Sequence, residues 1–123
     1  MKRLGAFRED GMRIDVRGRG CEVSLALSSY AERRALFAIG RFSPRIEGVS
    51  VRLSDANGPR GGVDKECRLV ARLRPSGGLR VVERDADMYA AIDRATERLA
   101  RAVAREIARR REPRRLSGAA DVV

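Results

Sequence analysis

Residues 87–93, Asp-Met-Tyr-Ala-Ala-Ile-Asp, begin the stretch of sequence that decides the fold. From Met88 to Ile107, apolar residues recur at intervals of three and four, and this spacing predicts a helix with one face in the core. We expect the helix to run from about Asp87 to Arg111. Its core face comprises Met88, Ala91, Ile92, Ala95, Leu99, Ala102 and Val103, with Tyr89 and Ile107 at the edge.

A row of arginines runs beside this apolar face. Its members are spaced by four, three, four and four residues: Arg94, Arg98, Arg101, Arg105 and Arg109. Like charges at these spacings destabilise an isolated helix by roughly 0.2–0.5 kcal/mol per pair, and Glu97 and Glu106 offset only part of the repulsion. The row therefore favours an anionic partner. A plain solvated surface is the alternative, because arginine is also a good helix former.

The charge balance narrows the class of partner. The 123 residues include 27 lysines and arginines against 17 acidic residues, which gives a net charge of +10 and a pI near 11.2. A strongly basic chain favours nucleic acid or another anionic surface as its partner. Because 43% of the residues are hydrophobic and regularly patterned, we expect one compact domain rather than a disordered basic tail.

The sequence lacks the residues that several classes of function require. Histidine is absent and the only cysteines are Cys21 and Cys67, so one copy cannot supply a Cys₄ or Cys₂His₂ zinc site. The sequence contains no Gly-x-Ser-x-Gly motif, no phosphate-binding P-loop and no carboxylate cluster with metal spacing. We therefore expect a protein that is not an enzyme, that has no metal, cofactor or small-molecule substrate, and whose two thiols stay unpaired.

The N-terminus carries no export or membrane signal. No apolar run follows its first basic residues, and no run elsewhere approaches the roughly 20 residues of a membrane span. We expect a cytoplasmic protein without membrane contact. Residues 1–10 are interpreted as a flexible basic leader, residues 11–111 as one domain and residues 112–123 as a flexible tail.

Alternation and turn residues divide the rest of the domain into four strands and one further helix. The strands are expected at Met12–Arg17, Ile46–Ser54, Glu66–Arg74 and Leu79–Arg84, and the helix from an N-cap at Ser24 to about Phe42. Gly48 marks an expected bulge. A strand, crossover helix and strand favour parallel pairing, and the short turns that follow favour an antiparallel meander. The predicted fold is α+β with the order β-α-β-β-β-α, in which both helices cover one face of a four-stranded sheet.

The period of two along the strands assigns side chains to the two faces of that sheet. The apolar face comprises Ile14, Val16, Val51, Leu53, Cys67, Leu69, Ala71, Leu73, Leu79 and Val81. The opposite face carries Arg13, Arg17, Arg52, Arg68, Arg72, Arg74, Arg80 and Arg84. The face that the helices leave uncovered is therefore expected to be wet and basic.

Two features leave alternatives open. The first helix has a wider apolar side than one core stripe needs, because Leu36, Phe37 and Ile39 extend it. These residues either pack beneath a loop or the C-terminus, or they form a contact surface for another protein. The glycine-rich loop 55–65, with Arg60 and Lys65, is either a simple hairpin connection or a segment whose backbone amides bind a phosphate.

These segments resemble the hibernation-promoting factors and ribosome-associated inhibitors, a bacterial family that binds the small ribosomal subunit. Residues 87–93 match the start of the family's last helix, and Leu99 and Arg101 follow as they do there. Upstream, Ile14-Asp15-Val16-Arg17-Gly18-Arg19 and Glu22-Val23-Ser24, with Ala26, Leu27 and Tyr30, resemble its first strand and the start of its first helix. The similarity covers roughly residues 12–111.

The resemblance implies a fold similar to double-stranded-RNA-binding domains and a function on ribosomal RNA. Binding is implied in the small-subunit channel that messenger and transfer RNA occupy, so that idle ribosomes are held silent under stress. It carries the RNA contacts over to Arg94, Arg98, Arg101 and Arg105 on the last helix and to Arg34 on the first, and the loop adds Arg60 and Lys65 as candidates.

The chain also departs from the family pattern. Phe37 stands where the family commonly has a lysine, and Ser28 and Ser29 replace a charged pair. Neither the ribosome-pairing domain of long members nor the acidic tail of some inhibitor-type members is visible, so we expect a short form. The competing interpretation is a protein-interaction module that modulates a transcription factor, through contacts of Leu36, Phe37 and Ile39.

Overall fold

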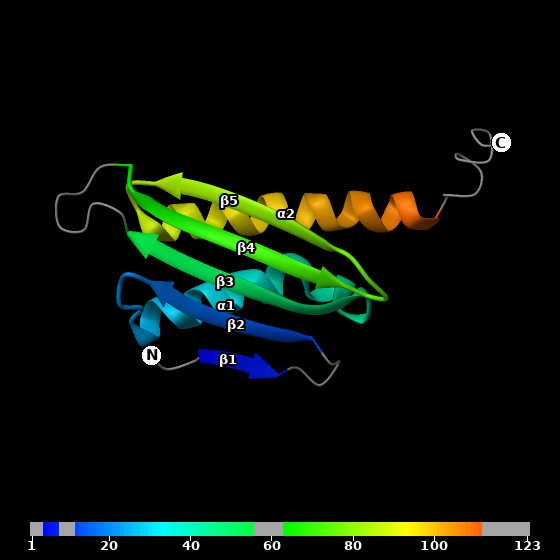
Figure 1. The fold of residues 1–123 in the computed structure, drawn as a ribbon, viewed down its shortest axis with the longest axis horizontal. Helices are drawn as coiled ribbons and strands as arrows, with labels where there is room; N and C mark the ends of the chain where they lie inside the picture. The colour runs from blue at the N-terminus through cyan, green and yellow to red at the C-terminus, as the bar shows by residue number, and fades with distance from the viewer. Residues whose placement is uncertain (1–3, 8–11, 56–62, 112–123) are drawn as a thin grey trace.

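The protein folds into one sheet with two helices packed on the same face. The computed structural model describes residues 4–7, 12–55 and 63–111. Its elements are β1 (Leu4–Phe7), β2 (Arg13–Arg19), α1 (Leu25–Ile39), the 3₁₀ helix η1 (Gly40–Arg45), β3 (Ile46–Asp55), β4 (Lys65–Leu73), β5 (Gly78–Asp85) and α2 (Met88–Arg111). Figure 1 shows the sheet in front and both helices behind it. The predicted α+β fold is confirmed, and so is its β-α-β-β-β-α order from β2 onwards.

The sheet has five strands in the order β1-β2-β3-β4-β5. Strand β2 pairs with β3 in parallel, as the crossover through α1 requires, and all other neighbours are antiparallel. The pairing of β3 with β4 shifts register between Ile46 and Gly48, so the predicted bulge is confirmed.

Strand β1 corrects the expected number of strands from four to five. Its residues Leu4–Phe7 were assigned to a flexible leader, but they pair antiparallel with β2 at the edge of the sheet. Four residues are too few for an alternation pattern, and the strand forms because β2 offers a free row of backbone groups on that side. The rest of the predicted leader and the tail 112–123 lie outside the described residues.

Helix α1 begins where the sequence predicts and ends earlier. The Ser24 hydroxyl accepts a hydrogen bond from the Leu27 backbone N–H at 3.1 Å, which is the expected N-cap. The helix ends at Ile39 instead of Phe42, and η1 follows it. Gly40 has low helix propensity, and Pro44 cannot donate a helical hydrogen bond, so the chain tightens into the 3₁₀ form before β3.

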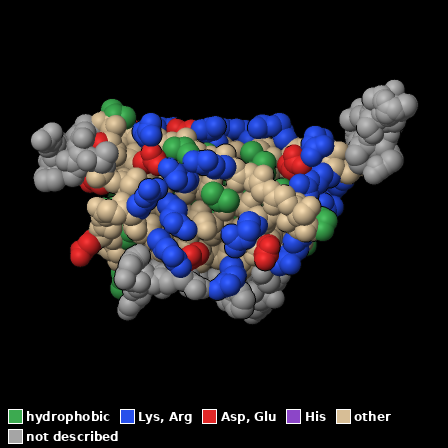
Figure 2. Space-filling model, in the orientation of Figure 1, with side chains coloured by type: hydrophobic (Ala, Val, Ile, Leu, Met, Phe, Trp, Pro, Cys, Tyr) green, Lys and Arg blue, Asp and Glu red, His purple; other side chains and the backbone are tan. Residues whose placement is uncertain are grey.

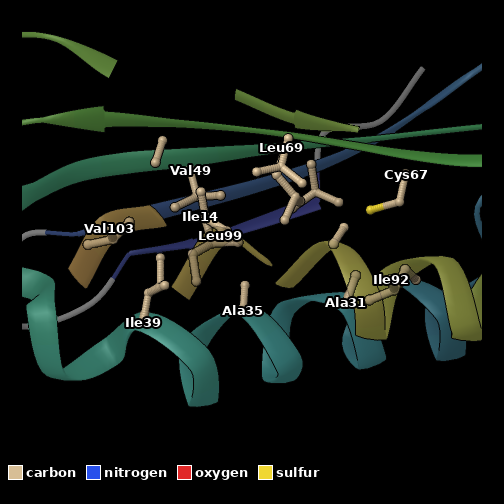
Figure 3. Close-up of a cluster of buried hydrophobic side chains, with 14 of the residues drawn as sticks. Ile14, Ala31, Ala35, Ile39, Val49, Cys67, Leu69, Ile92, Leu99 and Val103 are labelled. Carbon is tan, nitrogen blue, oxygen red and sulfur yellow. The ribbon is translucent and has the colours of Figure 1, made fainter. Parts of the chain in front are cut away.

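The core lies between the sheet and the two helices (Figure 3). Side chains from the sheet meet small and branched residues of both helices there, and the labelled members include Ile14, Val49 and Leu69 of the sheet, Ala31, Ala35 and Ile39 of α1, and Ile92, Leu99 and Val103 of α2. All of these are at most 2% exposed. The predicted core faces of the sheet and of the last helix are confirmed for most of their members, and the opposite sheet face is left to solvent. The exceptions are Leu79, Met88 and Ala102, which are half-buried, and Thr96 of α2, which is buried although it was not predicted.

Candidate nucleic-acid interface

The uncovered face of the sheet is strongly basic. Figure 2 shows lysine and arginine side chains spread across the strands on this side. We use the term sheet surface for Arg13, Arg17, Arg52, Arg68, Arg72, Arg80 and Arg84. Cross-strand pairing places Arg52 directly opposite both Arg17 on β2 and Arg68 on β4. Like charges in directly opposed positions destabilise a sheet, so this row is unfavourable for folding alone.

Acidic residues compensate the sheet surface only in part. Arg17 lies 3.2 Å from Asp15, and Glu66 pairs with both Arg68 at 3.3 Å and Arg84 at 2.9 Å. Within the described part of the chain, no ion pair involves Arg52 or Arg80, although both side chains are exposed. These two arginines are free to meet an anion.

A small hollow interrupts the sheet surface at Gly48. Gly48 stands between Arg13 on β2 and Arg72 on β4, and it has no side chain to fill the space between them. The hollow measures about 130 Å³ and is lined by Arg13, Asp15, Val49, Ser50 and Arg72. A methyl group at Gly48 would come within 3.3 Å of an Arg72 guanidinium nitrogen, so glycine lets the Arg72 side chain lie close to the backbone of β3.

The arginine row of α2 is divided by its contacts. Arg94 donates to Asp85 at 2.7 Å and to Glu83 at 3.3 Å, and Arg98 donates to Glu83 at 2.6 Å. Arg98 also donates to the Val82 carbonyl at 3.1 Å. The two arginines therefore fasten α2 to the edge strand β5.

The pKa values of the acidic partners reflect this pairing. Hydrogen bonding to Arg98, assisted by Arg94, lowers the pKa of Glu83 below its ordinary value. The pKa of Asp85 is also lowered, first by the backbone N–H of Asp87 and then by Arg94. Both carboxylates are thus charged at neutral pH and neutralise the arginines beside them.

The next two members of the arginine row have no acidic partner among the described residues. Arg101 and Arg105 are exposed, and no ion pair to either is found among residues 4–7, 12–55 and 63–111. Arg109 pairs with Glu106 at 2.5 Å. The predicted site on α2 is therefore uneven, because two of its four arginines serve the fold and two are available.

Arg34 lies between the helices. Its Nε atom is 3.0 Å from Asp93 and another guanidinium nitrogen is 3.7 Å from Glu97, both on α2. The Tyr30 hydroxyl donates to the same Asp93 carboxylate at 2.5 Å, and this contact raises the pKa of Tyr30. The Tyr30 ring also meets the edge of Tyr89 at a centroid distance of 4.8 Å. Arg34 thus belongs to a polar network that joins α1 to α2.

The two candidate RNA-binding residues of loop 55–65 are Lys65 at its end and Arg60 in its middle. Lys65 lies 3.0 Å from the buried carboxylate of Asp64 and 3.3 Å from Asp55, and the hydrogen bond to Asp64 raises the pKa of Lys65. These contacts close the base of the loop. Arg60 lies outside the described residues, so the phosphate-binding alternative for this loop stays a prediction.

The apolar surface expected on α1 is not contiguous. Ile39 is fully buried and Leu36 is half-buried against the core, whereas Phe37 is 84% exposed. The expected contact through all three residues is therefore wrong, because the sides of α1 that carry Leu36 and Ile39 turn towards the core. A single aromatic ring remains, which is far smaller than a protein-docking patch.

Glu83 and Asp85 are the residues that sequence reasoning missed. The alternation that places Val81 in the core also places Glu83 and Asp85 on the helix side of β5. Acidic residues that continue the core face of an edge strand, beneath a helix rich in arginine, could have predicted these ion pairs.

Other kinds of site have no counterpart in the described residues. They contain no group of three metal-ligating side chains, and none of their helices has the length and hydropathy of a membrane span. Cys21 and Cys67 are free thiols, and burial raises the pKa of Cys67 to about 12.

Comparison with known proteins assigns the chain to a family. The family described as Sigma 54 modulation protein / S30EA ribosomal protein matches residues 14–111. The chain belongs to this family. Its resemblance to ribosome hibernation factors is thereby confirmed.

Two solved structures agree with the assignment. The N-terminal domain of Protein Y from Thermus thermophilus is 33% identical, with 73% of this chain and 92% of that chain covered and a TM-score of 0.60. A ribosomal subunit interface protein from Coxiella burnetii shares the fold at 18% identity, with 77% and 97% covered and a TM-score of 0.64. The search of curated protein sequences found no match.

Proposed function

We propose that this protein is a ribosome-associated translation inhibitor that binds ribosomal RNA in the small-subunit channel used by messenger and transfer RNA. One observation carries the proposal: arginines that have no ion pair among the described residues lie on opposite faces of one small domain. Arg52 and Arg80 lie on the sheet surface, and Arg101 and Arg105 lie on α2 behind it. A protein that docks on a flat surface needs one basic face. A protein that fills a channel between RNA walls benefits from two.

The chemistry of the site suits the RNA backbone. Arginine guanidinium groups fork onto phosphate oxygens, and both a paired sheet and a packed helix hold them in fixed positions. Bound in the channel, the domain would exclude messenger and transfer RNA by occupying their space, without any covalent step. This role agrees with the name of the ribosomal subunit interface protein that shares the fold, and it implies a cytoplasmic location.

Co-sedimentation with small ribosomal subunits at several salt concentrations tests the proposal. Each phosphate contact adds about 0.7–0.9 to the slope of log affinity against log salt, so several contacts give a steep loss of binding. We expect binding at low salt, steep weakening at moderate salt and inhibition of translation in a cell-free system. Binding that stays flat between low and moderate salt would exclude this electrostatic mechanism.

A nuclease treatment separates RNA binding from the protein-interaction alternative. Partners recovered from cell extract should be lost after digestion of RNA if ribosomal RNA is the ligand. Partners that resist nuclease would favour a protein contact, and Phe37 is the most exposed large apolar side chain among the described residues that could make it.

A further inference from the structure

Phe37 is the most exposed large apolar side chain in the described part of the chain. Its side chain is 84% exposed on α1, compared with 73% for Leu25 at the start of the same helix. Exposing an aromatic ring of this size forgoes the free energy of burying it, so the ring is a candidate contact for a flat ligand.

The position of Phe37 follows from the contacts between the helices. Residues 30, 34 and 37 share one stripe of α1, because they are spaced by four and three residues. The first two members of this stripe touch α2 through Asp93 and Glu97. Phe37 is the next member, and the residues one turn beyond Glu97 on α2 are Ala100 and Arg101. No residue of α2 covers the ring, which is 84% exposed.

Arginines neighbour this ring in the sequence of both helices. Arg33 precedes Phe37 by one helical turn and Arg41 follows it by four residues, and on α2 Arg101 comes four residues after Glu97, the partner of Arg34. Arg33 and Arg101 have no ion pair within the described residues, and Arg41 stacks on Phe42 at 4.5 Å. Gly40, between Phe37 and Arg41, has nothing within 4 Å of where a side chain would begin. An apolar protein partner would gain little from one ring among arginines, whereas RNA supplies both a flat base and phosphates.

We propose that Phe37 is a stacking platform for one unpaired base of ribosomal RNA, and that Arg33, Arg41 and Arg101 hold the phosphates beside that base. Base stacking on an aromatic ring tolerates any base, since every base has a π-face, and the flanking arginines supply the charge-dependent part of binding. The proposal rests on the proposed function, because it requires the ribosome as ligand, and it adds a contact of this chain that is not electrostatic.

A tryptophan scan at matched positions tests the contact directly. The chain has no tryptophan, so Phe37→Trp and Leu25→Trp each create a single fluorophore on the same helix. With purified small ribosomal subunits as the probe, we expect the fluorescence of Phe37→Trp to be strongly quenched by base stacking. The Leu25→Trp control reports the quenching caused by absorption of light by the ribosome alone.

Affinity measurements separate stacking from hydrophobic contact. Phe37→Leu keeps an apolar side chain without a π-face, and Phe37→Ala removes it. Both should bind small subunits roughly 5- to 100-fold more weakly than wild type, with an unchanged salt slope, while Leu25→Ala binds normally. Circular dichroism should show that all variants are folded, because both positions are exposed.

Three results would overturn the proposal, and they differ from failure of the proposed function. Phe37→Trp could be quenched no more than Leu25→Trp in the bound state, Phe37→Leu could bind as tightly as wild type, or Phe37→Ala could match Leu25→Ala. The second of these would indicate an apolar contact with a ribosomal protein. If the proposed function itself is wrong, the wild-type chain already fails to bind small subunits.

Discussion

Replacing Arg101 and Arg105 together by alanine should abolish much of the RNA affinity and leave the fold untouched. Both side chains are exposed, and neither has an ion pair within the described residues. Alanine is the best helix former, and the change also removes repulsion between like charges. We therefore expect the free energy of unfolding to change by no more than about 0.5 kcal/mol.

Replacing Arg94 and Arg98, the paired arginines of the same helix, should instead destabilise the fold. Arg94 and Arg98 make three ion-pair contacts with Glu83 and Asp85, at 2.6–3.3 Å. Their side chains are 46% and 51% exposed, so solvent screens these contacts and each contributes about 0.2–1 kcal/mol. The Arg94→Ala, Arg98→Ala variant should thus lose about 1–2 kcal/mol, which corresponds to roughly 4–12 °C in Tm.

The RNA affinity can be estimated in the same way. A hydrogen bond to a charged group contributes about 1.5 kcal/mol, so losing Arg101 and Arg105 should weaken binding roughly 100-fold at low salt. Loss of two phosphate contacts should also reduce the salt slope by about 1.4–1.8. Filter binding or co-sedimentation with small subunits measures both quantities, and thermal melting by circular dichroism measures stability.

The matched control lies on the sheet surface. Arg52 and Arg80 are likewise exposed and without an ion pair in the described residues, so the double alanine variant removes the same charge from the other face. We expect it to weaken binding less than Arg101→Ala with Arg105→Ala, because a helix presents successive arginines to one strand of phosphates. If the sheet pair costs more affinity in the same buffer, the sheet is the principal RNA contact and the assignment to α2 is wrong.

Four further predictions concern stability and reactivity. Ile92→Asp should unfold the domain, because Ile92 is fully buried and an unpaired charge would sit between α2 and the sheet; unchanged melting would show that the core is misassigned. Tyr30→Phe should lower the free energy of unfolding by about 1.5 kcal/mol by removing the hydrogen bond to the carboxylate on α2, and denaturant unfolding measures it. The lowered pKa of Glu83 gives stability that is complete above its ordinary value of 4.5 and is lost as pH falls below it, so Glu83→Gln should flatten the acid side of a Tm-against-pH curve. Native alkylation at pH 8 should modify Cys21 before Cys67, whose pKa is about 12, and equal rates measured by mass spectrometry would contradict the burial.

Periodicity was sufficient for the parts of the fold that bury a continuous apolar face. The core face of α2 and the alternation of β3 and β4 could be predicted because each buried position repeats at the interval of its element. Strand β1 could not be predicted in this way, because it depends on the free edge of β2 and not on a pattern of its own. The exposure of Phe37 beside buried Ile39 likewise depends on where α1 meets the sheet and α2.

Charge patterns identified the arginine row of α2 but not its division into paired and unpaired members. The spacing of Arg94, Arg98, Arg101 and Arg105 is regular, so sequence alone treats the four as equivalent. Which of them are neutralised depends on Glu83 and Asp85, which the pairing of β5 with β4 places beside α2. A basic stripe in a sequence therefore overstates the charge that a folded protein offers to its ligand.

The paired and unpaired arginines of α2 act together in this interpretation. The ion pairs of Arg94 and Arg98 hold the first half of α2 against β5, and Arg34 holds the same half against α1. A helix fixed on both sides presents Arg101 and Arg105 in a defined position, so less conformational entropy is lost when phosphates bind. The intramolecular ion pairs thus reduce the number of unpaired arginines but increase the contribution of each remaining one to RNA affinity. This explains why, in a chain with net charge +10, some arginines pair with carboxylates of the same chain.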